Sequence, residues 1–161
     1  MTQKGRILLA VGIIILIAAA VAGVEIVRRA TSAPDLPPGS VPIYIDGKFI
    51  AAFSAADLAE LEQVSFVDAE EGKTQQGWLL RDVILLYVPK ADLASEATIT
   101  VSSSSRDKSA QVTWAEASDK DNMVMFDLSG RGTLKLVSKL EKLDVRDEWV
   151  QDVDKIEVSA P

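Results

Sequence analysis

The sequence predicts an α+β protein in which a single N-terminal transmembrane helix precedes a mixed-sheet domain with short helices. Residues 7–24 contain no charged or strongly polar side chain, and residues 31–42 hold four of the six prolines. The remainder is long enough for one hydrophobic core and too short for two domains of ordinary size. We therefore divide the chain into a short tail with an anchor (1–30), a proline-rich linker (31–42) and one globular domain (43–161).

The apolar run from Ile7 to Val24 predicts a membrane-spanning helix. At about 1.5 Å rise per residue, the run extended through Ile26 and Val27 reaches the roughly 30 Å of a bilayer's hydrocarbon core. The alternative is a cleavable signal peptide, because the small residues of Ala20–Ala22 offer a cleavage site behind a basic start. The run is longer than the apolar region of such peptides, about 7 to 15 residues, which favours an uncleaved anchor.

Two features of the anchor concern its place in the membrane. Basic residues flank the anchor on both sides, so the positive-inside rule gives little indication of its orientation. We expect a cytoplasmic N-terminus, with the domain on the extracytoplasmic side. Ala19 and Gly23 are four residues apart, a spacing that lets a second helix pack closely. The same spacing is frequent in alanine-rich spans, so simple anchoring in the lipid bilayer is the main expectation.

The linker and the domain are strongly acidic. Of the 17 Lys+Arg and 24 Asp+Glu residues, four basic and one acidic precede residue 31, which leaves a net charge of −10 for the rest. Such a surface is repelled by anionic lipid and lacks the basic stripe that nucleic acid requires. The residues before the linker prolines favour extended backbone, so the linker is expected to be a stalk of up to roughly 35 Å.

The first half of the domain begins with a predicted hairpin. Val41–Ile45 alternates as a strand, Asp46-Gly47 is a hairpin-turn dipeptide, and Lys48–Phe53 returns as the partner strand. Ser54 then caps a short helix, with Asp57 three residues on. Further strands are predicted at 64–69, 97–101, 110–114, 123–128, 134–137 and 153–158.

Two more helices and one loop complete the expected organisation. Trp78–Val88 is a strongly apolar helix that Pro89 ends. Thr113 and Glu116 have the spacing of a capping box, which predicts one further helical turn. The polar stretch 102–109 is expected as a loop between two strands.

The chain contains no cysteine and no histidine. Their absence excludes zinc fingers, iron–sulfur clusters, the usual haem ligands, cysteine nucleophiles and every triad that uses an imidazole. It also excludes disulfides, so cysteine usage does not indicate the redox state of the compartment.

Three groups of residues have side chains suited to catalysis or to ligand binding. Ser102–Ser105 with Lys108 has the composition of a serine–lysine nucleophile pair, although a polar loop is the simpler interpretation. Two carboxylate-rich runs offer oxygen ligands to a hard cation, without EF-hand spacing or its glycine. Three tryptophans offer stacking surfaces, although we expect them as core anchors. The runs are Asp144, Asp147, Glu148, Asp152 and Asp154, and Asp119, Asp121 and Asn122; the tryptophans are Trp78, Trp114 and Trp149.

Four segments, taken in order, resemble one protein family. They are Ile45-Asp46-Gly47-Lys48, Gly77 to Ile84, Gly130 to Val137 and Trp149 to Val158. Together they resemble the molybdopterin-binding domain of sulfite-oxidase-type oxidoreductases. The resemblance covers nearly the whole domain, and it implies an α+β fold with layers of mixed sheet and short helices.

The same resemblance implies a scaffold without the family's chemistry. Its catalytic members ligate molybdenum through a cysteine thiolate and hold the pterin with histidine and arginine, and this chain has neither cysteine nor histidine. A thiolate is the soft ligand that such a metal site requires. Ser105-Arg106-Asp107-Lys108 stands where the family often has a Ser-x-Asp-Gly-Tyr turn, so a turn is kept and the aromatic residue is lost. We therefore expect no cofactor, no catalytic residue and no metal ligand.

The function expected from the sequence is that of a membrane-anchored, non-catalytic binding or accessory subunit that contacts a protein partner in a membrane complex, such as an electron-transfer assembly. The expected partner contacts are acidic, because complementary charge sets steering and register: Asp144, Asp147, Glu148, Asp152 and Asp154. The alternative is a binder of a pterin- or nucleotide-like anion, whose candidate contacts are Arg81, Arg106 and Arg131. A molybdopterin-dependent oxidoreductase is a third hypothesis.

Overall fold

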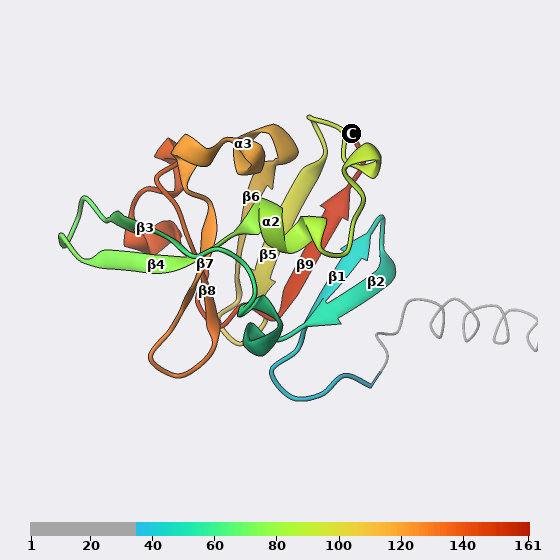
Figure 1. The fold of residues 1–161 in the computed structure, drawn as a ribbon, viewed down its shortest axis with the longest axis horizontal. Coiled ribbons are helices and arrows are strands. Elements are labelled where there is room, and N and C mark those ends of the chain that lie inside the picture. Colours follow the sequence, from blue (N-terminus) through green and yellow to red (C-terminus); the bar gives the residue numbers. More distant parts are fainter. Residues whose placement is uncertain (1–34) are drawn as a thin grey trace, which may run out of the picture. The chain divides into compact units, whose positions relative to one another are not determined.

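Two β-sheets form the part of the chain that the structure describes, residues 35–161 of a computed structural model (Figure 1). Sheet A has five strands in the order β2-β1-β9-β5-β6, and sheet B has four in the order β3-β4-β7-β8. In sheet A the bounds are β1 (Val41–Ile45), β2 (Lys48–Phe53), β5 (Thr98–Ser103), β6 (Lys108–Thr113) and β9 (Lys155–Ser159). In sheet B they are β3 (Val64–Val67), β4 (Thr74–Leu79), β7 (Met125–Leu128) and β8 (Leu134–Val137). Strands β1 and β9 run parallel, and the other neighbouring pairs are antiparallel.

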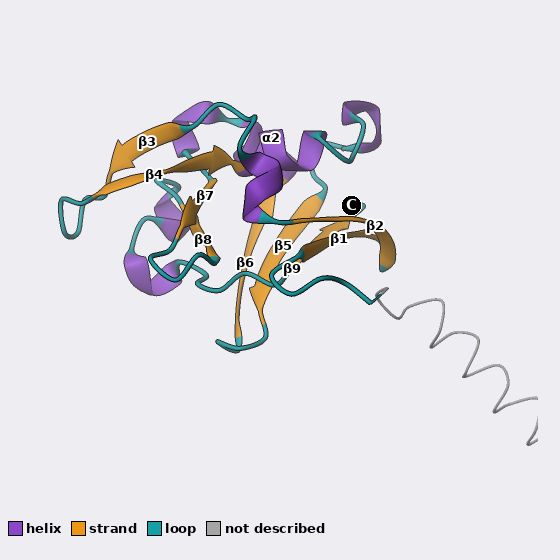
Figure 2. Cartoon of the chain, turned by 60° about the horizontal axis from the view of Figure 1, so that its bottom comes forward, coloured by secondary structure: helices purple, strands orange, loops and turns teal. Residues whose placement is uncertain are grey.

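Short helices connect the strands. The two α-helices are α2 (Leu80–Leu85) and α3 (Trp114–Ser118), and the 3₁₀ turns are η1 (Ala55–Leu58), η2 (Lys90–Asp92), η3 (Lys120–Asn122), η4 (Glu141–Leu143) and η5 (Arg146–Glu148). Figure 2 shows these helices at the ends and flanks of the strands. The α+β prediction of mixed sheet with short helices is therefore confirmed.

The predicted membrane anchor, with Ala19 and Gly23, lies in residues 1–34, outside the described residues. Within residues 35–161, no helix combines the length and the apolar character that a bilayer crossing requires. Residues 35–40 precede the first strand, and Val41 and Pro42, at the end of the predicted linker, already belong to β1.

The β1–β2 hairpin follows the prediction. Asp46 and Gly47 both have positive φ, 48° and 76°, which is the backbone that an Asp-Gly hairpin turn adopts. The register shifts between Ile43 and Tyr44, which pair with Ala51 and Phe49 respectively. Ile50, between these partners, is the extra residue of a β-bulge and is exposed.

The main core is shared by both sheets and by α2. Fully buried side chains come from sheet A, from sheet B and from the inner face of α2; examples are Ile43, Ile99, Ile156, Phe126, Leu136, Leu80 and Ile84. A smaller cluster covers the opposite face of sheet B and includes Met125 and Trp149. Because successive strand residues point to opposite faces, Phe126 packs in the main core while its neighbour Met125 packs in the small one.

The prediction of one helix over Trp78–Val88 is wrong at its start and also at its end, because α2 ends at Leu85. Trp78 pairs with Phe126 inside sheet B, and α2 begins only at Leu80. Gly77 allows β4 to pack this closely against β7, because a Cβ at that position would lie 1.7 Å from the Phe126 carbonyl oxygen. Trp78 and Leu79 at the end of β4 are buried in different clusters on the two faces of sheet B, so this apolar end does not differ in sequence from the helix that follows. The polar residues 74–77 that begin β4 lie outside every predicted strand.

Several other boundaries differ from the predictions, among them the end of β3, which lies at Val67 and not at residue 69. The expected loop 102–109 shrinks to a tight turn, because β5 continues to Ser103 and β6 already starts at Lys108. The strand expected from Met123 starts at Met125, since Met123 has a left-handed φ of 45° after η3. The last strand begins at Lys155, two residues later than expected.

Candidate binding sites

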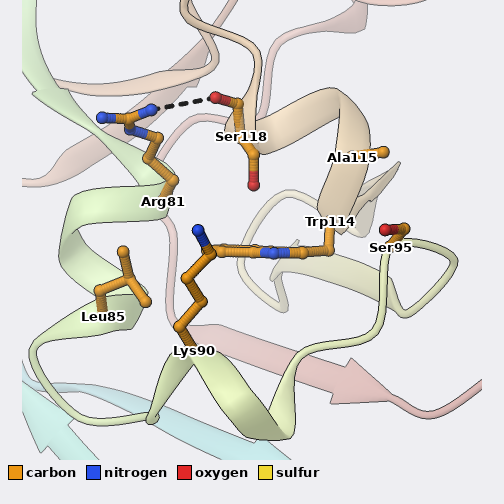
Figure 3. Close-up of a pocket in the computed structure, with 7 residues that line it drawn as sticks. All are labelled: Arg81, Leu85, Lys90, Ser95, Trp114, Ala115 and Ser118. Carbon is orange, nitrogen blue, oxygen red and sulfur yellow. Dashed lines mark hydrogen bonds between the residues drawn. The ribbon is translucent and has the colours of Figure 1, made fainter.

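A pocket of about 340 Å³ opens between α2 and α3 (Figure 3). The two helices contact one another, and η2 together with the segment before β5 completes the wall. The lining residues are Arg81, Leu85, Lys90, Ser95, Trp114, Ala115 and Ser118. Hereafter we call it the α2–α3 pocket.

Arg81 braces the two helices that form this pocket. Its Nη1 donates to the backbone oxygen of Ser118 at 3.0 Å, and its Nε donates to Asp82 Oδ1 at 3.0 Å. In Figure 3 the guanidinium points toward the end of α3. Arg81, a candidate anion contact, therefore lines a pocket while its Nη1 holds the end of α3 and its Nε is paired with Asp82 on its own helix.

The capping box at the start of α3 is present as predicted. Glu116 N donates to Thr113 Oγ1 at 3.1 Å, and Thr113 N donates to Glu116 Oε2 at 2.7 Å. Burial raises the pKa of Glu116, but hydrogen bonds from Lys142 and Thr113 outweigh it and hold that pKa below its usual value. Trp114, the first residue of α3, is 6% exposed and presents its ring to the pocket.

Polar groups without partners face the same pocket. The Lys90 amine makes no ion pair or hydrogen bond with any residue between 35 and 161. Ser118 Oγ is buried and also has no hydrogen-bond partner among these residues. Figure 3 shows the Lys90 amine and the Ser118 hydroxyl directed into the space beside the Trp114 ring.

An apolar surface adjoins the pocket on α2. Among residues 35–161 six large hydrophobic side chains are exposed, and the only two that are adjacent in sequence are Leu85, 39% exposed, and Leu86, 48% exposed. Leu85 also lines the pocket. Apolar exposure next to a pocket is typical of a site that another molecule covers.

A second hollow, of about 230 Å³, lies between the β5–β6 turn and η5. It is lined by Arg106, Lys108, Arg146, Asp147, Trp149 and Gln151, and we call it the basic hollow. The Lys108 amine donates to the backbone oxygen of Asp147, and Arg146 Nε is buried without a hydrogen-bond partner among residues 35–161. This set of donors suits an oxyanion. It does not fit molybdenum, because it includes no thiolate.

Arg146 anchors one wall of the basic hollow. Its Nη2 donates to Asp68 Oδ2 at 2.9 Å and its Nη1 lies 3.0 Å from Glu71 Oε2. Hydrogen bonds from Arg146 and from the Glu71 N–H hold the pKa of Asp68 well below its usual range. The Arg146 guanidinium also lies 5.4 Å from the centre of the Trp149 ring. These contacts fix η5 against the β3–β4 hairpin.

Two of the predicted anion contacts meet on one carboxylate. Asp152 accepts from Thr133 Oγ1 at 2.7 Å, from Arg106 Nε at 2.7 Å and from Arg131 Nη2 at 3.2 Å. The hydrogen bonds from Thr133 and then Arg106 lower the pKa of Asp152. Asp152 also has a left-handed φ of 54°. Arg106 and Arg131 therefore lie together, far along the chain from Arg81.

The predicted acidic partner contacts separate into two groups. Asp144, Asp147 and Glu148 are exposed on the η4–η5 segment. Asp152 is held by the two arginines, and Asp154 accepts from the Ser104 backbone N–H at 2.7 Å. Three of the five thus present their carboxylates to solvent, and two stabilise loops.

The structure gives no support to the serine–lysine pair, the cation site or the exposed stacking tryptophans considered from the sequence. Lys108 contacts the Asp147 carbonyl, and no hydrogen bond within residues 35–161 joins its amine to Ser102–Ser105. Within the same residues no three carboxylates converge on a possible metal position. The tryptophans are buried, as expected: Trp78, Trp114 and Trp149 are 6%, 6% and 4% exposed.

Sequence reasoning missed Lys90, Ser118 and Arg146. The exposed pair Leu85-Leu86 at the end of an apolar helix was the available indication of a binding face. No protein-family model matches the chain, and no curated protein matches it significantly. The likeness to the sulfite-oxidase family therefore stays a prediction from sequence.

Proposed function

We propose that this protein is a membrane-anchored, non-catalytic accessory subunit whose domain docks a protein partner on the α2–α3 pocket. The observation that carries the proposal is the exposed pair Leu85 and Leu86 beside a pocket whose other walls are Trp114 and two cations. Leu85 and Leu86 are 39% and 48% exposed, so covering the remaining surface against a partner contributes about 0.6–1.4 kcal/mol each. The lining also includes Trp114 and Arg81, whose residue types are enriched at interface hot spots.

The acidic η4–η5 segment supports the same function through steering. Asp144, Asp147 and Glu148 are exposed around Val145, itself 43% exposed. The segment adjoins α3, because Lys142 Nζ lies 2.7 Å from Glu116 Oε2. A basic partner surface would be attracted to these carboxylates and guided toward the neighbouring pocket.

The remaining parts of the proposal come from the sequence. The apolar run before residue 31 supports an anchor, and a chain without cysteine or histidine supports a role other than the chemistry of the sulfite-oxidase family. That resemblance makes a membrane electron-transfer complex the proposed partner, with the domain on the extracytoplasmic side as a degenerate molybdopterin-binding scaffold. Mixed sheets with short helices are compatible with it.

The experiment is a mild-detergent purification of the full-length protein from its native membranes, with co-purifying subunits counted by mass spectrometry. Leu86→Asp places a charge on the docking surface, and Val67→Asp is the matched control, because Val67 is 62% exposed on β3. We expect a stoichiometric partner with the wild type and with the control, and its loss with Leu86→Asp. A wild-type protein that emerges alone would overturn the proposal.

The basic hollow favours a second candidate function, the binding of a small oxyanion such as the phosphate of a nucleotide or pterin. Arg106, Lys108 and Arg146 come from separate elements and converge there. A ligand that binds the folded state raises the melting temperature with its concentration. Lys108→Gln should abolish that shift while Arg131→Gln, outside the hollow, keeps it. A flat response of the wild type to phosphate, pterins and nucleotides would reject this candidate.

A further inference from the structure

We infer that the α2–α3 pocket recognises a carboxylate on an apolar or aromatic body, presented by the protein partner as a side chain or a chain end. This inference rests on the proposed docking function and adds the chemistry of the group that enters the pocket.

The charges of the lining point to an anion. Both ionisable residues in the lining, Arg81 and Lys90, are cations, and no carboxylate lines the pocket. This contrasts with the net charge of −10 that follows residue 30. Arg81 is partly compensated by Asp82, so the net local charge is close to the single charge of Lys90. A singly charged carboxylate matches it better than a doubly charged phosphate.

Lys90 is the donor of the lining that a ligand meets directly. Lys90 is exposed and without a partner among residues 35–161, so its amine is free to meet a ligand. Ser118 Oγ is unpartnered in the same part of the chain, and leaving a buried hydroxyl unsatisfied costs about 1–3 kcal/mol. The Ser118 oxygen is screened from solvent, so a carboxylate that enters the pocket is held by Lys90.

The apolar lining indicates that the carboxylate is attached to an apolar group, and that this group belongs to the protein partner. In Figure 3 the Trp114 ring and Leu85 lie on either side of the Lys90 chain, and this apolar lining suits an aromatic or aliphatic group. Leu86 continues the apolar surface beyond the lining. A free small molecule would leave that leucine uncovered, whereas a partner segment covers it. We therefore assign the carboxylate to the partner.

The test uses the full-length protein in detergent with ¹⁵N-labelled tryptophan, and phenylacetate as the probe. Trp114→Phe assigns the Trp114 indole signal. We expect phenylacetate to shift that signal saturably and the neutral phenylacetamide to bind about tenfold more weakly, as for loss of a charge-assisted hydrogen bond. Lys90→Gln should weaken the binding of phenylacetate to a similar extent, and Ser118→Ala should weaken it less. Lys120→Gln, on η3 outside the lining, should have no effect.

Each outcome bears on one part of the inference. Equal binding of phenylacetate and phenylacetamide would overturn carboxylate recognition, and so would the absence of any shift at Trp114. Saturating phenylacetate should release the co-purified partner from the wild type; binding without release would overturn the assignment of the carboxylate to the partner. The titrations with phenylacetate and phenylacetamide do not depend on the purification that tests the docking function, whereas the release measurement follows once that purification has yielded a partner.

Discussion

Arg146 and Asp68 form a hydrogen-bonded ion pair at 2.9 Å across a sequence separation of 78 residues. The Asp68 side chain is 1% exposed, and it also accepts from Gln75 Nε2 at 2.9 Å. The pair joins the β3–β4 hairpin to η5. It thereby holds the acidic η4–η5 segment in one position, so that its carboxylates are pre-organised for a partner.

The ion pair predicts a specific pH dependence of stability. The folded-state pKa of Asp68 is lowered, so its contribution is fully present above the unfolded-state pKa, about 3.9, and is lost as the pH falls toward the folded-state pKa. Asp68→Asn should be less stable than the wild type at pH 7 in urea unfolding. The difference between the two should stay constant down to about pH 5 and shrink below about pH 4. Parallel stability curves from pH 7 to pH 3 would contradict this account.

Gly77 should be the most sensitive glycine of the domain. Its replacement by alanine places a Cβ against the Phe126 carbonyl, which is backbone and cannot rotate away. We expect Gly77→Ala to lower the free energy of unfolding by about 1–3 kcal/mol or more. Gly130→Ala is the matched control, because a Cβ there meets nothing within 4 Å, and it should change stability by less than about 0.5 kcal/mol. Urea unfolding of both variants compares them directly.

The capping box positions α3 and with it one wall of the α2–α3 pocket. Thr113→Ala removes the acceptor of the Glu116 N–H and should cost about 0.5–2 kcal/mol of unfolding free energy. Thr113→Ser keeps the hydroxyl and should restore most of the loss. Thermal or urea unfolding measures both, and equal losses for alanine and serine would show that the Thr113 methyl group, not its hydroxyl, matters.

Charge reversal on the η4–η5 segment should weaken partner association without unfolding the protein. Lysine in place of Asp144, Asp147 and Glu148 removes the proposed steering, so partner recovery should fall most at low salt. The double variant Glu60→Lys with Glu62→Lys is the control, because both residues are exposed before β3. Unchanged recovery of the partner at low salt would remove this segment from the interface.

Local patterns in the sequence predict much of the sheet architecture. The Asp46-Gly47 turn and the Thr113–Glu116 box are short-range features, and both are present. The strand at Trp78 was missed because burial on both faces removes the alternation on which strand prediction depends. Boundaries near Met123 depend on a left-handed backbone that no side-chain pattern indicates.

The candidate sites were harder to predict than the strands. Arg106 and Arg131 meet on Asp152 only because separate loops converge in three dimensions. The Arg146–Asp68 pair has the same long-range origin. The sequence around Lys90 does not indicate its role, since the residue lines a pocket only because α3 lies beside it in the folded chain.

The most direct test of the docking account is site-specific photo-crosslinking in native membranes. A benzophenone amino acid replaces Leu86 in one variant and Val67 in another, both exposed positions. We predict that illumination of the Leu86 variant joins the protein to one discrete partner, identified by mass spectrometry, and that the Val67 variant gives no such product. Absence of a crosslinked product from position 86, or the same product from both positions, would contradict docking at the α2–α3 pocket.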